Sequence, residues 1–188
     1  MMFFKTIDDF LNKSYFKELQ ESLESDQFPW YYNKNISHLN KEKANVFEDF
    51  GFTHWFIHEE NGLSDTQLAH FIKPFISKIM DTIDYNKVLR SRADMVTWTK
   101  NNFLHDAHQD FQFPHKACVF YINESDGDTV FYNVTKNDYN DKCKIQERVS
   151  PKPNRLVIFD GDLMHSGHSP SQHKRRIIIN SNFINVED

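Results

Sequence analysis

The sequence lacks the segments that mark secreted and membrane-bound proteins. No apolar stretch approaches the roughly 20 residues that a membrane-spanning helix requires. The first residues, Met-Met-Phe-Phe-Lys-Thr, lead into an acidic stretch without the apolar core of a signal peptide. Cysteine is scarce as well, since Cys118 and Cys143 are the only two. These absences predict a cytoplasmic protein in a reducing compartment, with no membrane partner.

Long basic runs are also missing. The longest is Lys174-Arg175-Arg176, and the formal net charge is −5. A protein that binds nucleic acid usually carries an extended basic stripe for the phosphates. Nucleic acid is therefore not expected as a partner. The sequence contains no internal repeat and no low-complexity segment either.

What the chain does contain is typical of a folded globular protein. Its 188 residues are 39% hydrophobic and 15% aromatic, and 18 of them are Phe. This length fits one domain with a continuous core. We therefore expect residues 1–188 to form a single domain, with a helical and irregular part over residues 1–89 and a β-rich core over residues 90–184.

Helical periodicity is visible first in residues 8–25. The apolar side chains of this segment recur at helical spacing, and Asp8 and Asp9 suit the first turn of a helix. The pattern predicts an amphipathic helix that covers a sheet from outside. The ring-rich stretch that follows, residues 26–62, shows no clear period.

A second helix is predicted to begin at Ser64 or Asp65, either of which is a good N-cap, and to end at Ile83. Its apolar residues form one stripe, as expected for a helix that packs on a core. Pro74 interrupts the segment. Because proline removes a backbone hydrogen bond and clashes with the preceding turn, we expect either a kink or two shorter helices.

From Arg90 onward, short β-branched and aromatic runs alternate with Asn, Asp, Gly and Pro, which is typical of an antiparallel all-β unit. No helix-length segment lies between these runs, so a sandwich or barrel is favoured over βαβ units. The predicted strands are Ala93–Thr99, Lys116–Asn123, Thr129–Asn133, Lys144–Val149, Arg155–Asp160 and Arg176–Phe183.

The motif His108-Gln109-Asp110 is a candidate for part of a metal site. Two histidines and one carboxylate on one face of a non-haem iron leave three positions open for a co-substrate and O₂. Residues at i and i+2 on an extended strand point the same way, so both side chains reach one metal and a third ligand comes from another strand. The pair alone is weak evidence, because roughly 0.9 His-x-Asp pairs are expected by chance in this composition. His58-Glu59 even begins a second His-x-carboxylate motif.

An ordered series of further motifs gives this pair its significance. After Asp110 come KACVFYIN at residues 116–123, GDTVF at 127–131, PKPNRLVIFD at 151–160, then His165 and Arg176. The series resembles the 2-oxoglutarate and iron(II)-dependent oxygenases of the prolyl hydroxylase type, over about residues 90–184. It looks closest to the small members encoded by bacteriophages, which share a segment like Phe28-Pro29-Trp30-Tyr31-Tyr32.

The resemblance implies a mainly β fold with flanking helices, namely a double-stranded β-helix or jelly roll with N-terminal helices packed on the sheet. It implies His108, Asp110 and His165 as the metal ligands. It also implies that Arg176 binds the far carboxylate of 2-oxoglutarate, because a guanidinium matches a carboxylate with two hydrogen bonds. Tyr121 matches a family tyrosine that often hydrogen-bonds the same carboxylate.

Three residues compete for these roles. His105 is a rival ligand to the His108 pair, His168 is a rival to His165, and Arg175 is a rival to Arg176. Strand alternation separates the two arginines, because it places Arg175 on a more apolar face that is suited to packing against a helix. Arg176 shares the other face with Ile178, Asn180 and Asn182.

The implied cofactors are Fe(II), 2-oxoglutarate as co-substrate and O₂, with ascorbate as a further candidate. Because Asp110 retains the carboxylate ligand, hydroxylation is expected and not halogenation. The expected substrate is a prolyl or other residue in a peptide or protein, and the expected location is the cytoplasm, including that of a phage-infected bacterium. A small-molecule oxygenase and a non-catalytic metal-binding β-helix module are the alternatives.

The chain departs from the family pattern at two turns. Asn154 stands where the family usually has glycine, and Asp126-Gly127 replaces a pair of glycines. Thr129 and Phe131 match the Gly-x-Thr-x-Phe signature of the family, which we interpret as structural. Neither the departure at Asn154 nor the one at Asp126 touches a proposed ligand.

Overall fold

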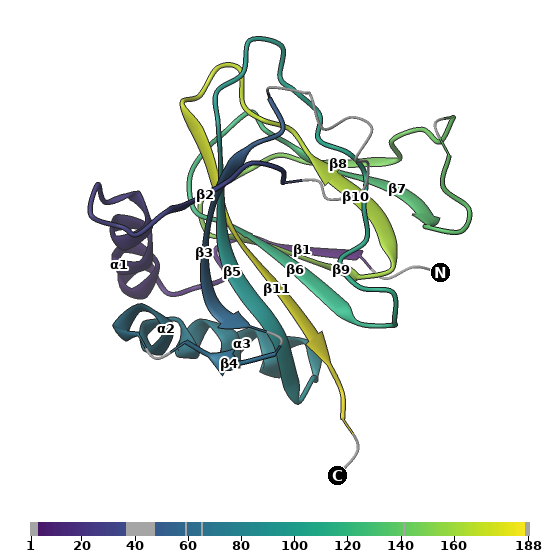
Figure 1. The fold of residues 1–188 in the computed structure, drawn as a ribbon. Coiled ribbons are helices and arrows are strands. Elements are labelled where there is room, and N and C mark those ends of the chain that lie inside the picture. The colour runs from purple at the N-terminus through teal and green to yellow at the C-terminus, as the bar shows by residue number, and fades with distance from the viewer. Residues whose placement is uncertain (1–3, 37–47, 59, 65, 141, 187–188) are drawn as a thin grey trace.

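Two antiparallel β-sheets lie opposite each other in the computed structural model of this protein (Figure 1). The structure describes residues 4–36, 48–58, 60–64, 66–140 and 142–186. In order of pairing, the larger sheet contains β1 (Phe4–Ile7), β9 (Arg155–Asp160), β6 (Lys116–Tyr121), β11 (Arg175–Ile184), β5 (Lys87–Thr97), β3 (Gly51–His58) and β2 (Tyr31–Asn33), and β4 (Gly62–Leu63) pairs with β3. The smaller sheet contains β10 (Leu163–Gly167), β7 (Thr129–Thr135) and β8 (Glu147–Val149). This arrangement confirms the predicted mainly β, jelly-roll fold.

Three helices cover the outer face of the larger sheet, at the lower left of Figure 1. They are α1 (Lys13–Glu24), α2 (Gln67–Phe71) and α3 (Lys73–Ile83). Leu19 of α1 and Ile79 of α3 belong to one buried cluster with Phe120 of β6 and Ile179 of β11. Burial of such side chains is worth about 1.5–3 kcal/mol each. The helices are therefore attached to the sheet by its main apolar core.

Helix α1 begins later than predicted. Asn12 is its N-cap, and the Asn12 side chain accepts a hydrogen bond from the backbone N–H of Tyr15 at 2.9 Å. Asp8 and Asp9 therefore precede the helix, and their prediction as first-turn residues is wrong. The Asp8 carboxylate instead accepts hydrogen bonds from Arg155, which lies on β9.

Pro74 divides the second helical segment into two, which was one of the predicted outcomes. It lies in the first turn of α3, where its missing N–H costs nothing because that donor has no intrahelical partner. Helix α2 is capped by Thr66, so Ser64 is not the N-cap, and Asp65 lies outside the described residues. No helix within the described ranges is both long and apolar enough to cross a membrane.

All six predicted strands are present, with shifted bounds at most of them. The bounds of β9 agree with the prediction, whereas β5 begins at Lys87, ahead of the predicted Ala93, and β8 is confined to Glu147–Val149. The stretch that lacked a clear period contains β3, which pairs with both β5 and β2. Side chains on both faces of β3 are buried, so its sequence does not alternate between polar and apolar residues.

The two faces of β11 have different neighbours, as alternation predicted. Ile177, Ile179 and Phe183 belong to the apolar cluster that includes the helices. Ile178 belongs to a second cluster, between the sheets, and Arg176 is buried on that same face. The face of β11 that looks toward the smaller sheet therefore carries Arg176, Asn180 and Asn182.

Asn154 explains one departure from the family pattern. Its backbone has a φ of 63°, a left-handed conformation that Asn adopts more readily than most residues. Its side chain accepts a hydrogen bond from the N–H of Leu11 and donates one to the carbonyl of Leu11, both at 2.8 Å. The N–H of Phe10 also donates to the Asn154 carbonyl at 3.0 Å. Asn154 thus ties the segment before α1 to the turn before β9.

Replacing Asn154 by the usual glycine is expected to destabilise the protein. Asn154→Gly permits the same backbone conformation but leaves both buried polar groups of Leu11 without partners, which costs about 1–3 kcal/mol of the free energy of unfolding. Asn154→Ala should cost about 1 kcal/mol more, because the left-handed conformation disfavours a Cβ. Urea unfolding of both variants measures this, and a glycine variant as stable as the parent would contradict it.

Candidate active site

His108 and His165 are held side by side by their backbones. The His108 N–H donates to the His165 carbonyl and the His165 N–H donates to the His108 carbonyl, both at 2.9 Å. His165 lies on β10, whereas His108 and Asp110 lie in the loop between β5 and β6. The predicted strands did not include residues 108–110, and His108 forms an isolated antiparallel bridge with His165. This pair of hydrogen bonds sets the position of His108.

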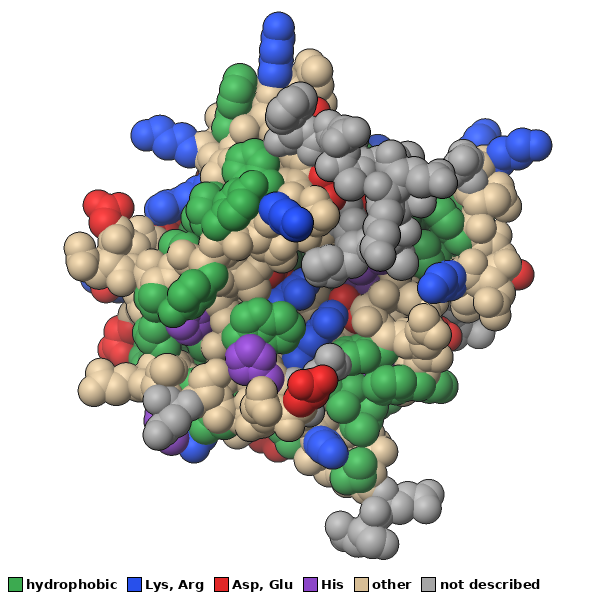
Figure 2. All heavy atoms as spheres, viewed as in Figure 1, with side chains coloured by type: hydrophobic (Ala, Val, Ile, Leu, Met, Phe, Trp, Pro, Cys, Tyr) green, Lys and Arg blue, Asp and Glu red, His purple; other side chains and the backbone are tan. Residues whose placement is uncertain are grey.

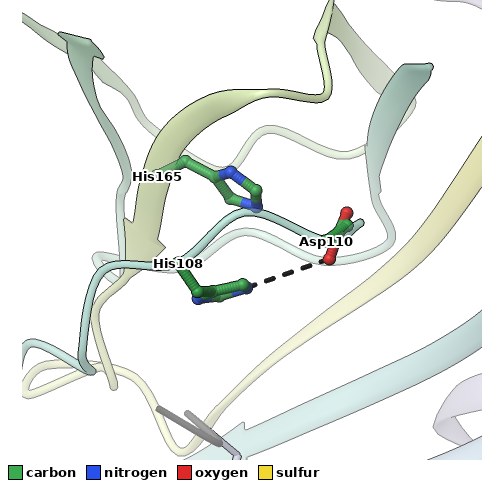
Figure 3. Close-up of side chains that lie close together, drawn as sticks. All are labelled: His108, Asp110 and His165. Carbon is green, nitrogen blue, oxygen red and sulfur yellow. Dashed lines mark ion pairs between the residues drawn. The ribbon is translucent and has the colours of Figure 1, made fainter. Parts of the chain in front are cut away.

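The side chains of His108, Asp110 and His165 converge (Figure 3). One potential ligand atom of each lies within 4.8 Å of the others. The Nε2 atom of His108 is 3.9 Å from Oδ1 of Asp110, and the two imidazole rings are 4.6 Å apart between centroids. A divalent cation fits among these atoms with small side-chain movements, and two histidines and a carboxylate are the ligand set of non-haem iron(II) sites.

Both histidines are oriented for binding through Nε2. Nδ1 of His108 is 3.2 Å from the Asp106 carbonyl, and Nδ1 of His165 is 2.9 Å from the Leu163 carbonyl. A carbonyl oxygen only accepts hydrogen bonds, so each Nδ1 carries the proton and Nε2 keeps a free lone pair. This is the usual support for a metal-binding imidazole.

The protonation states also favour a cation. Burial and the neighbouring His165 lower the pKa of His108 to about 4, so His108 is neutral at neutral pH. Burial by itself raises the pKa of Asp110, but Arg90 and the two histidines hold it well below its usual range. A neutral imidazole and an ionised carboxylate are the forms that bind a metal.

Asp110 is held by two residues that sequence reasoning missed. Nη2 of Arg90 donates to Oδ1 of Asp110 at 2.5 Å, and Nδ2 of Asn182 donates to Oδ2 at 2.8 Å. Nε of Arg90 also donates to the side-chain oxygen of Asn182 at 2.7 Å. This network fixes the carboxylate plane, since both of its oxygens are bonded.

Arg176 is a buried cation on the same sheet face. It is 7% exposed, its Nη2 donates to Oγ1 of Thr129 at 2.7 Å, and its Nε has no hydrogen-bond partner in the described part of the chain. It forms no ion pair with any carboxylate among the described residues. A buried guanidinium without a counter-ion is costly, so this one is suited to an anionic ligand.

Thr129 connects Arg176 to Tyr121. The Tyr121 hydroxyl donates to Oγ1 of Thr129 at 2.6 Å, and the guanidinium of Arg176 lies 5.7 Å from the Tyr121 ring centroid. Thr129 lines a cavity together with Arg176, His108 and His165. Thr129 was interpreted as structural, and its position in this cavity is a feature that the motif did not reveal.

The rival residues are not part of the group of converging ligands, although His105 lines the same cavity. His105 is hydrogen-bonded between Asp49, 2.8 Å from its Nδ1, and Ser169, 3.0 Å from its Nε2. His168 stands outside the group that converges at His108. The guanidinium of Arg175 lies beside Glu24 of α1, at 3.8 Å, on the opposite face of the sheet from Arg176.

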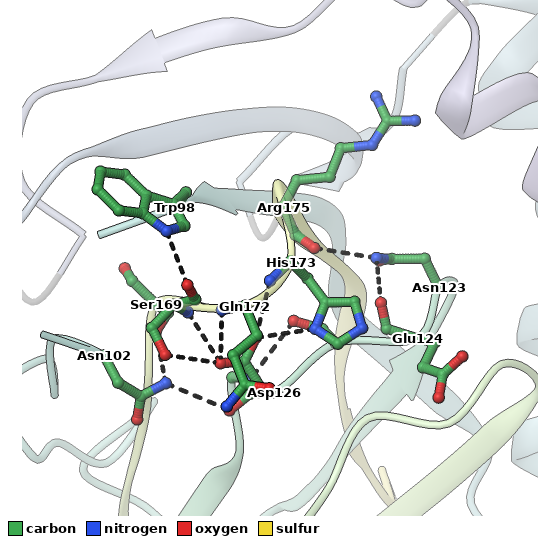
Figure 4. Close-up of polar contacts among 12 residues, drawn as sticks. Trp98, Asn102, Asn123, Glu124, Asp126, Ser169, Gln172, His173 and Arg175 are labelled. Carbon is green, nitrogen blue, oxygen red and sulfur yellow. Dashed lines mark hydrogen bonds and ion pairs between the residues drawn. The ribbon is translucent and has the colours of Figure 1, made fainter. Parts of the chain in front are cut away.

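Asp126, the second departure from the family pattern, fastens the loop that leads into β11 (Figure 4). Its Oδ2 accepts hydrogen bonds at 2.9 Å from the N–H and hydroxyl of Ser171 and from the N–H of Gln172. Its Oδ1 accepts from the N–H of His173 at 3.2 Å. Burial raises the pKa of Asp126, but these hydrogen bonds outweigh burial and hold the pKa below its usual range.

The glycine that follows Asp126 lies against Arg176. A Cβ added at Gly127 would lie 2.9 Å from Cδ of Arg176 and 2.5 Å from the carbonyl oxygen of His168. Such contacts are too short for any side chain, so glycine is needed at this position. The turn at Gly127 therefore lies directly against the Arg176 side chain.

Comparison with known proteins points in one direction. A family model described as the 2OG-Fe(II) oxygenase superfamily matches residues 93–184. None of the curated protein sequences compared with the chain matches it.

Several solved structures share the fold. A prolyl hydroxylase from Trichoplax adhaerens, in complex with a peptide fragment of the hypoxia inducible factor oxygen degradation domain, is 16% identical, with a TM-score of 0.64 over 96% of this chain and 83% of that one. A Pseudomonas putida prolyl-4-hydroxylase is 11% identical, with a TM-score of 0.63 over 99% and 94%. The α-ketoglutarate-dependent epimerase SnoN from nogalamycin biosynthesis is 10% identical, with a TM-score of 0.65 over 97% and 78%.

We predict that one divalent cation binds among His108, Asp110 and His165. Alanine at any of the three should weaken Co(II) binding at least roughly 100-fold, beyond the 10–100-fold usual for residues that only support a ligand. Titration followed by the visible absorption of Co(II) measures this. His168→Gln is the matched control and should change the affinity by less than about threefold. Loss of binding in His168→Gln, with His165→Ala unaffected, would reverse the assignment.

Proposed function

Because this chain belongs to the 2OG-Fe(II) oxygenase superfamily, whose enzymes use Fe(II), 2-oxoglutarate and O₂, we propose that it hydroxylates a C–H bond of a prolyl or other residue in a peptide or protein. One observation carries the proposal. The cavity that contains His108 and His165 also contains Arg176, a buried guanidinium with no carboxylate partner among the described residues. A simple metal site has no use for such a group.

Each residue has a defined task in this proposal. His108, Asp110 and His165 hold Fe(II), which supplies the oxidising chemistry when 2-oxoglutarate and O₂ are bound. Arg176 receives the far carboxylate of 2-oxoglutarate, through its unpartnered Nε and the edge that faces the cavity. Because Arg176 and His165 are buried, the charged co-substrate is drawn out of water and fixed in one orientation.

A path toward the surface supports a peptide substrate. The hollow that contains His108 and Asp110 shares Gln109, Gln112 and Lys136 with an outer hollow, which extends to Phe113. Phe113 is exposed, and its ring stacks on that of Phe111 at 5.1 Å. An extended peptide that lies along this path and contacts the Phe113 ring would place one of its residues at the metal.

A small-molecule substrate is the second candidate, and Ile36 favours it. Ile36 lines both hollows that border His108. Its aliphatic side chain takes up space beside the metal ligands, which suits a compact molecule better than a polypeptide. A non-catalytic metal-binding module, the third alternative, leaves the buried Arg176 without a purpose.

We also propose that the chain acts as one domain in a reducing cytoplasm. The N-terminal part supplies β1 and β3 to the same sheet as β5, β6, β9 and β11. Both cysteines, Cys118 and Cys143, are free thiols.

The test is succinate formation from 2-oxoglutarate by anaerobically iron-loaded protein when air is admitted. Arg176→Gln should raise the KM for 2-oxoglutarate at least about 30-fold, because loss of one partner of a buried charge pair costs 2–5 kcal/mol. Arg175→Gln is a matched control, since Arg175 lies on the opposite face, and it should leave the KM within about twofold.

Failure of this test has a clear form. If the parent protein forms no succinate and its metal-loaded form does not bind 2-oxoglutarate, the oxygenase proposal is wrong. If both arginine variants behave alike, the co-substrate is bound elsewhere.

Asp126→Gly, which restores the family residue, should weaken 2-oxoglutarate binding. It removes the hydrogen bonds that the Asp126 carboxylate accepts from Ser171, Gln172 and His173, so the loop that leads into β11 just before Arg176 loosens. A loss of about 1 kcal/mol corresponds to a roughly fivefold higher KM for 2-oxoglutarate. The Co(II) affinity should stay unchanged, because the metal ligands are held by other contacts. An unchanged KM would contradict this role for Asp126.

A further inference from the structure

A third buried arginine, Arg92, lies on the same sheet face as Arg90 and Arg176. Its side chain is 12% exposed. Arg90 is engaged by Asp110, and Arg176 is the proposed site for the co-substrate. Neither the metal nor the co-substrate accounts for Arg92.

Arg92 is held rigidly with its terminal nitrogens free. Its Nε donates to Oδ2 of Asp94 at 2.9 Å, and Oδ1 of Asp94 accepts from the hydroxyl of Thr53 at 3.1 Å. The guanidinium lies 5.4 Å from the ring centroid of Trp55, its cross-strand neighbour on β3. Neither Nη1 nor Nη2 is hydrogen-bonded to any of the described residues. The outer edge of the guanidinium is therefore fixed in place for a ligand.

Arg92 borders the place where the substrate must react. Together with His108 and Ile36, it lines both of the hollows that meet at the metal ligands. Burial acts to lower the pKa of Arg92, but the carboxylates of Asp94 and Asp110 raise it, so the side chain is a permanent cation beside the metal site. Figure 2 shows basic and acidic side chains gathered in a hollow near the centre of the molecular surface seen in that view.

The charge around these two hollows is positive, although the chain as a whole carries −5. Among the described residues that line them, the basic ones are Arg90, Arg92, Lys136 and Arg176, and the acidic ones are Asp94 and Asp110. Four positive and two negative charges leave +2, and Fe(II) with doubly charged 2-oxoglutarate adds zero. A site with this residual charge attracts an anion.

Asn180 supplies a second, independent sign of a ligand. It is directly across from Arg92 in the pairing of β11 with β5, and it lines the cavity with His108 and Arg176. It is 6% exposed, and its side-chain oxygen has no hydrogen-bond partner within the described ranges. A buried amide oxygen without a partner is costly unless a ligand donates to it.

We propose that Arg92 binds a carboxylate of the substrate that the enzyme oxidises. Asn180 accepts a hydrogen bond from an N–H or O–H group near that carboxylate. The substrate class is then a free amino acid, a related carboxylic acid, or a peptide that presents its carboxylate beside the reactive C–H bond. A planar carboxylate matches the two free nitrogens of one guanidinium. This inference rests on the proposed oxygenase function, because it assumes that the metal marks the reacting position.

The test compares matched acids and amides on the intact protein. Zn(II) and saturating 2-oxoglutarate occupy the site without turnover, and saturation-transfer NMR measures the binding of each probe. The probes are N-acetylproline with N-acetylprolinamide, benzoate with benzamide, and phenyl phosphate. We expect each acid to bind at least about tenfold more tightly than its amide, as one charge-assisted pair worth about 1.4 kcal/mol provides.

Three variants locate the effect. Arg92→Gln should reduce the acid preference below about threefold. Asn180→Asp is nearly isosteric and places a negative charge opposite Arg92, so it should also abolish the preference even if Arg92→Gln folds poorly. Arg148→Gln is the control, because the Arg148 side chain is 52% exposed on β8 and lines neither hollow. It should keep the full preference.

Acids that bind no better than amides, or a preference that survives in both Arg92→Gln and Asn180→Asp, would overturn the proposal. Tighter binding of phenyl phosphate than of benzoate would overturn the choice of a carboxylate. Succinate formation by the parent protein is measured in parallel. If succinate forms without an acid preference, only the substrate inference fails, whereas absence of succinate together with absence of 2-oxoglutarate binding removes the function on which it rests.

Discussion

The register of β11 between β5 and β6 is the constraint on which the site depends. This pairing places Arg176 opposite Val96, Asn180 opposite Arg92 and Asn182 opposite Arg90. Side chains alternate along a strand, so a slip of one residue would turn all three polar β11 side chains toward the helices and bring Ile177 and Ile179 into the cavity. The helices prevent such a slip because their apolar core needs those isoleucines. Packing on one face of the sheet therefore fixes the chemistry on the other.

Buried charges on this face are balanced in different ways. Arg90 and Asp110 neutralise each other, and Asn182 bonds to both, so the Asp110 carboxylate, a proposed metal ligand, keeps its orientation. Arg176 has no carboxylate partner among the described residues, and its neighbours Thr129 and Tyr121 are neutral. Pairing offsets the cost of burying Arg90, whereas the cost of burying Arg176 is offset only when an anion binds. Arg90 therefore supports Asp110, whereas Arg176 is suited to bind an anionic ligand.

Sequence reasoning worked where the information was local. Alternation around Ile177 and Ile179 separated Arg175 from Arg176, and Pro74 divided a helix as its covalent structure requires. It failed where a contact joins distant segments or where both faces of an element are buried. Both faces of β3 are buried, so its sequence shows no alternation of polar and apolar residues. Asn154 acquires its role from Leu11, far away in the chain, and a sequence read alone contains no sign of that contact.

The residues that sequence reasoning missed have something in common. The motif contains the residues proposed to bind the metal or the co-substrate, whose chemistry is the same throughout the family. Arg90 and Asn182 hold the Asp110 carboxylate, so their residue types depend on how each chain supports that group. Arg92 is proposed to bind the substrate, which differs from one enzyme to another. A family motif cannot specify such a residue, and only the cross-strand pairing that brings Arg92 beside Trp55 and Asn180 reveals its position.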